Sequence, residues 1–113
     1  MAMDATLSVS LDAYVLDVLM PDLVGHDRQP SAFLVYLFLW RKTDAGEHEV
    51  EVSLREMAES IGISKRAVQD AIARLARRGL VETDRASITA VSVFRLRRPW
   101  VDRGLQSGQT SVD

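Results

Sequence analysis

The side chains best suited to chemistry in this chain recur at helical spacing between residues 64 and 78, and most of them are hydrogen-bond donors. With about 100° of rotation per residue, a helix over this stretch turns its polar side chains to one face and its apolar ones to the other. Arginine and glutamine can donate to base edges, and arginine and lysine can pair with phosphates. Arg66, Asp70, Ala73 and Arg77 lie opposite the apolar residues, with Gln69 and Arg74 flanking them. The candidate DNA-binding residues of this stretch are Ser64, Lys65, Arg66, Gln69, Asp70, Arg74, Arg77 and Arg78.

These candidates divide by their position along the helix. Lys65, Arg66 and Gln69 fall near its start, the part of a helix docked in the DNA major groove that meets base edges. Arg74, Arg77 and Arg78 lie further along, where phosphates would be near. A charged helix face can also be nothing more than a solvated surface, and for any one of these arginines that alternative stays open. The cluster as a whole favours binding to a nucleic acid.

The elements that position this face are two short helices over residues 53–80. Ser53 can cap the first, with Glu56 completing a capping box, and Ser64 can cap the second. Gly62 can adopt the positive φ that a tight turn between them requires. The pattern predicts a helix-turn-helix. Apolar residues at helical spacing let its helices pack together: Met57, Ala58 and Ile61 on the first, and Val68, Ile72 and Leu75 on the second.

Upstream of this motif, the pattern predicts two further helices. An apolar stripe over residues 7–19 indicates the first, with Ser8 or Ser10 as its cap and Pro21 forcing a break or kink. Residues 25–30 have the composition of a loop, and Pro30 suits the first turn of the next helix, which runs to about residue 43. Residues 33–40 make this helix apolar on all sides, which favours a buried central helix over a buried strand.

Downstream and just before the motif, the pattern predicts strands. Residues 47–52 alternate polar and apolar side chains as a short strand does, and residues 80–83 and 88–96 predict a β-hairpin. Gly79 can end the second helix of the motif. Arg85 lies at the hairpin tip, either as a contact to the minor groove or DNA backbone or as an ordinary turn residue. The predicted fold class is mainly α with a small β-hairpin wing, a winged helix-turn-helix.

Charge is unevenly distributed along the chain. The chain has 113 residues, of which 47% are hydrophobic, enough for one compact domain and too few for two. Its net charge is only −2, but residues 53–100 carry ten Lys or Arg and five Asp or Glu, whereas residues 1–52 carry three and nine. A basic half can approach a phosphate backbone while the acidic half faces away from it.

Several function classes have little support. The chain has no cysteine, which excludes disulfides, thiolate chemistry and a zinc finger. The longest apolar stretch is too short to span a membrane and the N-terminus lacks a signal-peptide pattern, so we expect a cytoplasmic protein with no membrane association. His26 and His48 have no nucleophile or metal-ligand spacing to join them. We therefore expect no catalytic site, no metal, no cofactor and no enzyme activity.

Residues 30–98 resemble the winged helix-turn-helix domains of bacterial transcription regulators and plasmid replication initiators. Ala71 departs from the resemblance, since such motifs often have a larger aliphatic residue there, and Ile72 and Leu75 are expected to take over its packing. The resemblance implies sequence-specific binding to double-stranded DNA, usually as a dimer, with contacts from Ser64, Lys65, Arg66, Gln69 and Asp70. It is carried by Leu54, Ala58, Gly62, Ile63, Ser64, Val68 and Leu75, and by Arg78-Gly79-Leu80-Val81.

We therefore predict a bacterial transcriptional regulator, with a replication-initiation or partition protein and a protein-interaction module as the alternatives. The predicted organisation is an N-terminal helix and loop over residues 1–29, a DNA-binding domain over residues 30–100 and a flexible tail over residues 101–113. A homodimer is expected, because one recognition helix covers only a few base pairs. The alternative is that the N-terminal helix folds back over its own core. The expected dimer surface comprises Leu11, Tyr14, Val15, Val18 and Leu19, with the uncovered part of residues 33–40.

Overall fold

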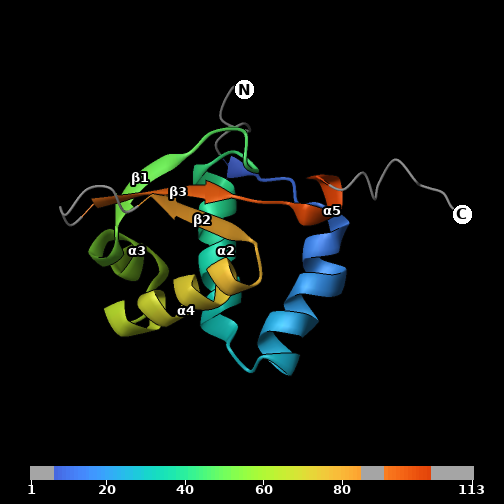
Figure 1. The fold of residues 1–113 in the computed structure, drawn as a ribbon, viewed down its shortest axis with the longest axis horizontal. Helices are drawn as coiled ribbons and strands as arrows, with labels where there is room; N and C mark the ends of the chain where they lie inside the picture. Colours follow the sequence, from blue (N-terminus) through green and yellow to red (C-terminus); the bar gives the residue numbers. More distant parts are fainter. Residues whose placement is uncertain (1–6, 85–90, 103–113) are drawn as a thin grey trace, which may run out of the picture.

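The computed structural model describes residues 7–84 and 91–102. A small sheet crosses one side of the molecule, and the helices pack beneath and beside it (Figure 1). The predicted order of two helices, a strand, a helix-turn-helix and a hairpin is confirmed. The elements are η1 (Val15–Leu19), η2 (Pro21–His26), α2 (Pro30–Lys42), β1 (Val50–Ser53), α3 (Leu54–Ile61), α4 (Lys65–Arg77), β2 (Val81–Asp84), β3 (Val91–Leu96) and α5 (Pro99–Asp102).

The N-terminal helix exists, but its predicted bounds were wrong at both ends. The backbone becomes helical at residue 13 and stays so to residue 26, in two π-helical segments that meet at Met20. Pro21 therefore does not end the helix. It occupies the first position of η2, where a missing N–H costs least. The N–H of Met20 bonds to the carbonyl of Val15, one residue further back than in an α-helix, and such wider turns can absorb an irregularity.

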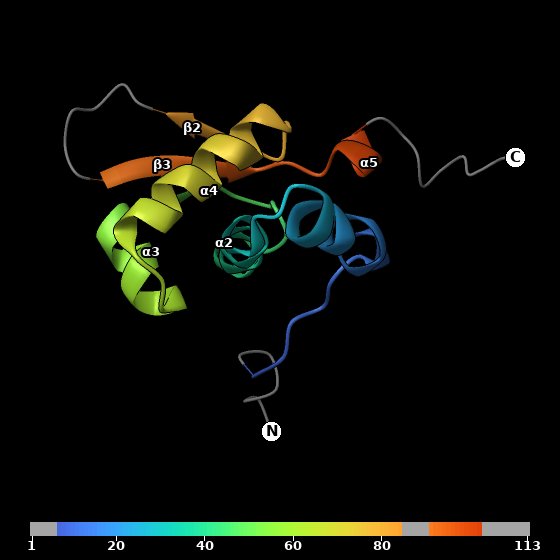
Figure 2. The same cartoon turned by 90° about the horizontal axis from the view of Figure 1, so that it is seen from below.

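α2 is the central helix, as predicted, and the strand alternative for residues 33–40 is wrong. The N-terminal helix and α3 lie on opposite sides of α2, and α4 crosses α2 from the α3 side toward the N-terminal helix (Figure 2). Two of its buried rings carry a polar atom, and each donates to a backbone carbonyl: Tyr36 Oη to that of Arg97 at 2.9 Å and Trp40 Nε1 to that of Ser10 at 2.8 Å. One side of α2 still faces solvent, since Leu34 is 41% exposed.

The sheet is antiparallel with the strand order β1-β3-β2. Val50 pairs with Phe94 across one edge, and Val81 pairs with Leu96 across the other. Phe94 and Leu96 are buried, whereas Arg95 between them is exposed, which settles the inward face of β3. Mainly helical, with a helix-turn-helix followed by this hairpin, the chain has the predicted winged-helix architecture.

The C-terminal end of the described chain folds back onto the N-terminal helix. Residues 99–102 form α5, although residues 101 and 102 were predicted to belong to a flexible tail; residues 103–113 of that tail lie outside the described residues. The Trp100 ring stacks on Tyr14 with their centroids 4.4 Å apart, and its Nε1 donates to Asp12 at 3.0 Å. Arg98 also contacts Asp12, at 3.2 Å. These contacts tie residues 12–14 to the end of the sheet.

Two residues expected on a dimer surface lie in the core instead. Val15 is fully buried and Leu19 is 4% exposed, and both join the same hydrophobic cluster as α2 and the sheet. For these two residues, the alternative that the helix folds back over its own core is what the structure shows. The reason is their spacing of four residues, which puts Val15, Leu19 and Leu23 on one side of the N-terminal helix, facing the hydrophobic core.

Within residues 7–84 and 91–102, no helix has the length and apolar content needed to cross a membrane.

Candidate nucleic-acid interface

The caps that position the second helix of the motif are present as predicted. Ser53 Oγ accepts a hydrogen bond from the N–H of Glu56 at 3.0 Å, and Ser64 Oγ accepts one from the N–H of Ala67 at 3.0 Å. Gly62 between the helices has φ 89°, which a residue with a side chain rarely adopts. Each cap satisfies one backbone donor that a helix start leaves unpaired. α4 therefore begins at a defined residue and in a defined direction.

The buried side of α4 differs by one residue from the prediction. Val68, Ala71 and Leu75 have no exposed surface, whereas Ile72 is half-buried. Leu75 packs in the core as expected, and Ile72 packs against it while only partly buried. What the prediction missed is that Ala71 itself is fully buried in the core. A small side chain here lets α4 lie close to α2. Ile72 is turned toward the hairpin, on the flank of the helix.

The opposite side of α4 is open to solvent. Ser64, Lys65, Arg66, Gln69, Asp70 and Arg77 are all exposed. Arg66 Nε lies 3.4 Å from Asp70 Oδ1, but both side chains are more than half exposed, so the pair is worth about 0–1 kcal/mol. Lys65 and Arg77 make no ion pair or side-chain hydrogen bond within the part of the chain that the structure describes. These side chains are free to meet a partner.

Arg78 is paired with carboxylates of the fold itself, and its contact to a DNA phosphate stays a prediction. Its Nε donates to Asp27 Oδ2 at 2.7 Å and its Nη2 donates to Asp27 Oδ1 at 2.8 Å. A second carboxylate oxygen, Asp22 Oδ2, lies 3.4 Å from Arg78 Nη1. The Arg78 side chain is 30% exposed and that of Asp27 only 5%. Through its two hydrogen bonds to a buried carboxylate, Arg78 joins the end of α4 to the loop between η2 and α2.

The charge state of Asp27 follows from this pairing. The hydrogen bond from Arg78 holds the pKa of the Asp27 carboxyl far below its usual range, against the opposing effect of burial. A hydrogen bond from His26 and the charges of Arg78 and Arg74 lower that pKa further. The same hydrogen bond raises the pKa of Arg78. Both groups are therefore charged at neutral pH.

Arg74 is intermediate between a held and a free side chain. Its Nε donates to Gln29 Oε1 at 3.2 Å and lies 3.8 Å from Asp27 Oδ2, while the side chain remains 35% exposed. Sequence reasoning missed Asp27 and Gln29 as partners of α4. No local pattern could have found them, because 45 to 51 residues separate them from the arginines they hold.

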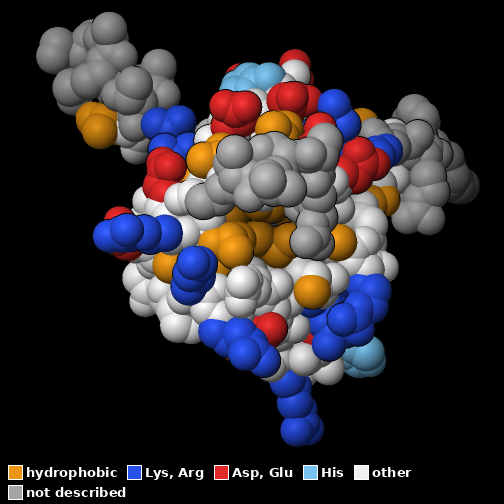
Figure 3. All heavy atoms as spheres, turned by 60° about the vertical axis from the view of Figure 1, so that its left-hand side comes forward, with side chains coloured by type: hydrophobic (Ala, Val, Ile, Leu, Met, Phe, Trp, Pro, Cys, Tyr) orange, Lys and Arg blue, Asp and Glu red, His pale blue; other side chains and the backbone are white. Residues whose placement is uncertain are grey.

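The exposed side of α4 lies between two hollows, and Ala73 lines both of them. The first, of about 370 Å³, lies on the hairpin side, where Ile72 and Ala76 face Thr83 and Phe94. The second, of about 450 Å³, lies on the other flank, against the loop that joins η2 to α2. In Figure 3, basic side chains gather on the lower part of this face, and acidic ones are concentrated at the top.

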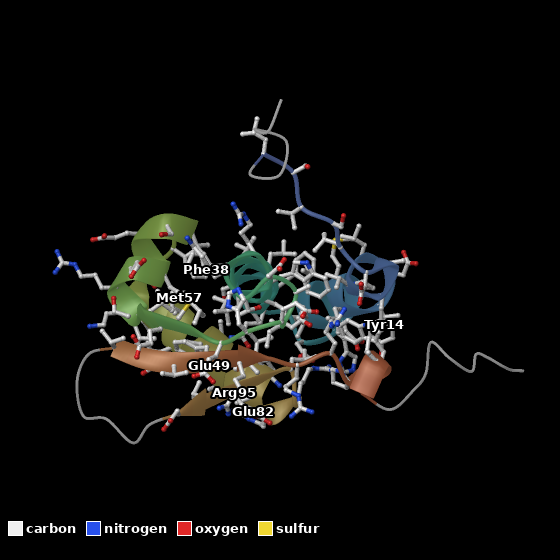
Figure 4. All side chains as sticks on the ribbon, turned by 90° about the horizontal axis from the view of Figure 1, so that it is seen from above. Tyr14, Phe38, Glu49, Met57, Glu82 and Arg95 are labelled. Atoms are coloured by element: carbon white, nitrogen blue, oxygen red, sulfur yellow. The ribbon has the colours of Figure 1, made fainter. Side chains whose placement is uncertain are left out.

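The basic residues of the sheet, in contrast, are paired with acidic ones. Arg95 Nη2 lies 2.9 Å from Glu49 Oε2, and its Nη1 lies 3.9 Å from Glu82 Oε1. Figure 4 shows Arg95 between these two carboxylates on the outside of the sheet. Arg97 pairs with Glu82 as well. The basic excess of residues 53–100 is therefore concentrated on α4, apart from Arg85, which lies outside the described residues and keeps its wing contact as a prediction only.

The part of the chain that contains this surface matches a known family model, described as a helix-turn-helix domain, over residues 29–81. Residues 29–81 form a helix-turn-helix domain. The matched region begins just before α2 and ends at the first residue of β2, so the wing is identified by the sheet rather than by the family match. Helix-turn-helix domains that bind DNA place the second helix of the motif, here α4, in the major groove. Neither the curated proteins nor the solved structures contain a match to the chain.

Proposed function

We propose that the helix-turn-helix domain binds double-stranded DNA in a sequence-specific manner and that the protein is a bacterial transcriptional regulator. The observation that carries this proposal is the open face of α4. Lys65, Arg66 and Gln69 are exposed in the part of the helix that meets base edges when such a helix docks. No part of the described fold covers them.

The side chains on this face divide by the chemistry they offer. Arg66 can donate twice to guanine and Gln69 can pair with adenine, while Asp70 can accept from cytosine. Ser64 uses its oxygen as an acceptor for the cap, so its hydroxyl hydrogen stays available to a phosphate. Lys65, Arg77 and the exposed part of Arg74 supply positive charge to the backbone.

We further propose that the protein acts as a homodimer, through a surface other than Val15 and Leu19. Leu16, Met20 and Val24 recur every four residues on the N-terminal helix and are 45%, 41% and 38% exposed. An exposed row of large apolar side chains is suited to a matching row in a second copy. Two recognition helices would double the length of DNA read, which a genome-wide search requires.

Fluorescence anisotropy with labelled duplexes tests the DNA proposal. The logarithm of the affinity should fall linearly with the logarithm of the salt concentration, with a slope of several units. Selection of bound fragments from genomic DNA should then recover one motif, and an inverted repeat in it would agree with a dimer. Absence of duplex binding at low salt would overturn the proposal.

A further inference from the structure

A second basic surface lies beside α4, on the flank away from the hairpin. It is the hollow of about 450 Å³ between α4 and the loop that joins η2 to α2. The loop contributes Arg28, Gln29 and Ser31 to its wall, and α4 contributes Arg74 and Arg77. Three guanidinium groups, a side-chain amide and a hydroxyl thus surround one space, and all of these groups can donate hydrogen bonds to an anion.

Two of the three arginines that line this hollow have no acidic partner in the part of the chain that the structure describes. Arg28 and Arg77 are exposed, and neither makes an ion pair or a side-chain hydrogen bond among residues 7–84 and 91–102. Arg74 is directed to the same place by Gln29, which accepts a hydrogen bond from its Nε at 3.2 Å. Positive charge is therefore concentrated at the mouth of the hollow.

Two carboxylates also line the hollow. Asp70 is paired with Arg66, which lies outside the hollow. Asp27 is paired with Arg78 outside it and also lies 3.8 Å from Arg74 within it. Asp27 accepts two hydrogen bonds from Arg78, at 2.7 and 2.8 Å. Asp70 lies 3.4 Å from Arg66. Three arginines line the hollow against these two carboxylates, and Asp27 is held by Arg78 as well, so a net positive charge remains to attract an anion.

The residue type at position 28 supports a role for its side chain. Arg28 has φ 55°, in the left-handed region that favours glycine or asparagine. The chain needs this conformation to turn from η2 into α2, but the turn does not need an arginine. The side chain makes no described ion pair or hydrogen bond with the rest of the fold, so it is available to an anion.

The position of the hollow beside α4 indicates that the anion is a phosphate of the DNA backbone. A helix in the major groove has the backbone of one DNA strand on each of its flanks. Ala73 lies at the rim of both hollows, so the exposed side of α4 has the hairpin on one flank and Arg28 on the other. One DNA strand would therefore pass the hairpin, and the other DNA strand would pass Arg28.

We propose that Arg28 and Arg77 bind a backbone phosphate of this second strand while α4 reads the bases. The inference rests on the proposed function and extends the DNA contact to a loop that lies outside the helix-turn-helix motif itself. A free phosphate has the same chemistry as the backbone phosphate, so the test includes both.

The test compares Arg28→Gln with Arg41→Gln in the full chain. Arg41 is the matched control because it is also exposed and makes no described ion pair, and it lies at the far end of α2, roughly 16 Å along the helix axis from Pro30. With a random-sequence duplex, Arg28→Gln should lower the affinity about five- to tenfold at about 0.1 M salt and reduce the salt slope by about one unit. Arg28→Lys should keep the slope, and Arg41→Gln should change neither quantity.

Thermal unfolding of Arg28→Gln should match that of the wild-type chain, which separates a lost contact from a lost fold. If the wild-type chain binds duplex DNA with a steep salt dependence and Arg28→Gln binds equally well, this inference is wrong and the proposed function stands. If the wild-type chain binds no duplex at low salt, the proposed function fails first. A third arm titrates inorganic phosphate: saturable binding that Arg28→Gln abolishes, with DNA affinity unchanged, would overturn the assignment to a DNA strand.

Discussion

Arg78 and Asp27 form a two-point contact between the end of α4 and the loop that follows η2, with Nε and Nη2 of the arginine 2.7 and 2.8 Å from the two carboxylate oxygens. The N-terminal helix is thereby fixed to the helix proposed to read DNA. The pair has a structural role, so its loss should lower the free energy of unfolding.

Asp27→Ala should lower the free energy of unfolding by about 1–3 kcal/mol, because Arg78 keeps its partial burial and loses its main partner. Urea denaturation followed by circular dichroism measures this. Asp70→Ala is the matched control, since it removes a carboxylate from an exposed arginine pair, and its effect should stay within about 0.5 kcal/mol. Equal effects of the two substitutions would contradict a buried, structural Asp27.

The same carboxyl group should make stability depend on acid pH. Its pKa is lower in the folded chain than in the unfolded chain, so its contribution is present above the unfolded pKa of about 4 and is lost as the pH falls toward the folded value. The stability difference between the wild-type chain and Asp27→Asn should therefore be largest near neutral pH and shrink below about pH 4. Unfolding midpoints of both chains across this range provide the measurement; a constant difference would refute the linkage.

Arg66→Ala and Gln69→Ala should each weaken binding to the selected site by about 1–3 kcal/mol while leaving random-sequence binding nearly unchanged. The reason is that a base contact is lost only on the correct sequence. Anisotropy titrations with the selected site and with a scrambled duplex compare the two. Equal losses on both duplexes would make these residues phosphate contacts instead.

Arg77→Ala should behave differently from those two substitutions. Arg77 is exposed and unpaired within the described chain, near the end of α4, so its loss should lower affinity on every sequence and reduce the salt slope by about one unit. A salt series on a random-sequence duplex is sufficient to measure this. An unchanged slope would remove Arg77 from the phosphate contacts.

Leu16→Asp combined with Met20→Asp should convert a dimer to a monomer without unfolding the chain, because both side chains are about half exposed. Light scattering reports the mass, and circular dichroism reports the fold. Val15→Asp is the contrasting variant: Val15 has no exposed surface, so a carboxylate there should unfold the protein. A monomer mass for the wild-type chain, both free and on its selected DNA site, would show that the homodimer proposal is wrong.

Local features of the fold were predictable because their causes are local. Ser53 and Ser64 cap helices through hydrogen bonds that span three residues, and Gly62 makes its turn with its own backbone. Pro21 shows the limit of such rules. A proline usually interrupts an α-helix, and only the actual backbone reveals that π-helical turns carry the chain past it.

The sequence by itself determined the helix-turn-helix and the side of α4 that faces outward, because helical periodicity places Arg66 opposite Val68, with Gln69 on the flank, whatever surrounds them. Only the tertiary structure decided which basic residues stay free. Arg77 and Arg78 are neighbours of the same type. Arg78 forms an ion pair with Asp27, whereas Arg77 forms no ion pair or side-chain hydrogen bond in the described chain. That difference arises from packing the η2–α2 loop against α4, which joins residues 51 positions apart, and no local pattern encodes such a contact.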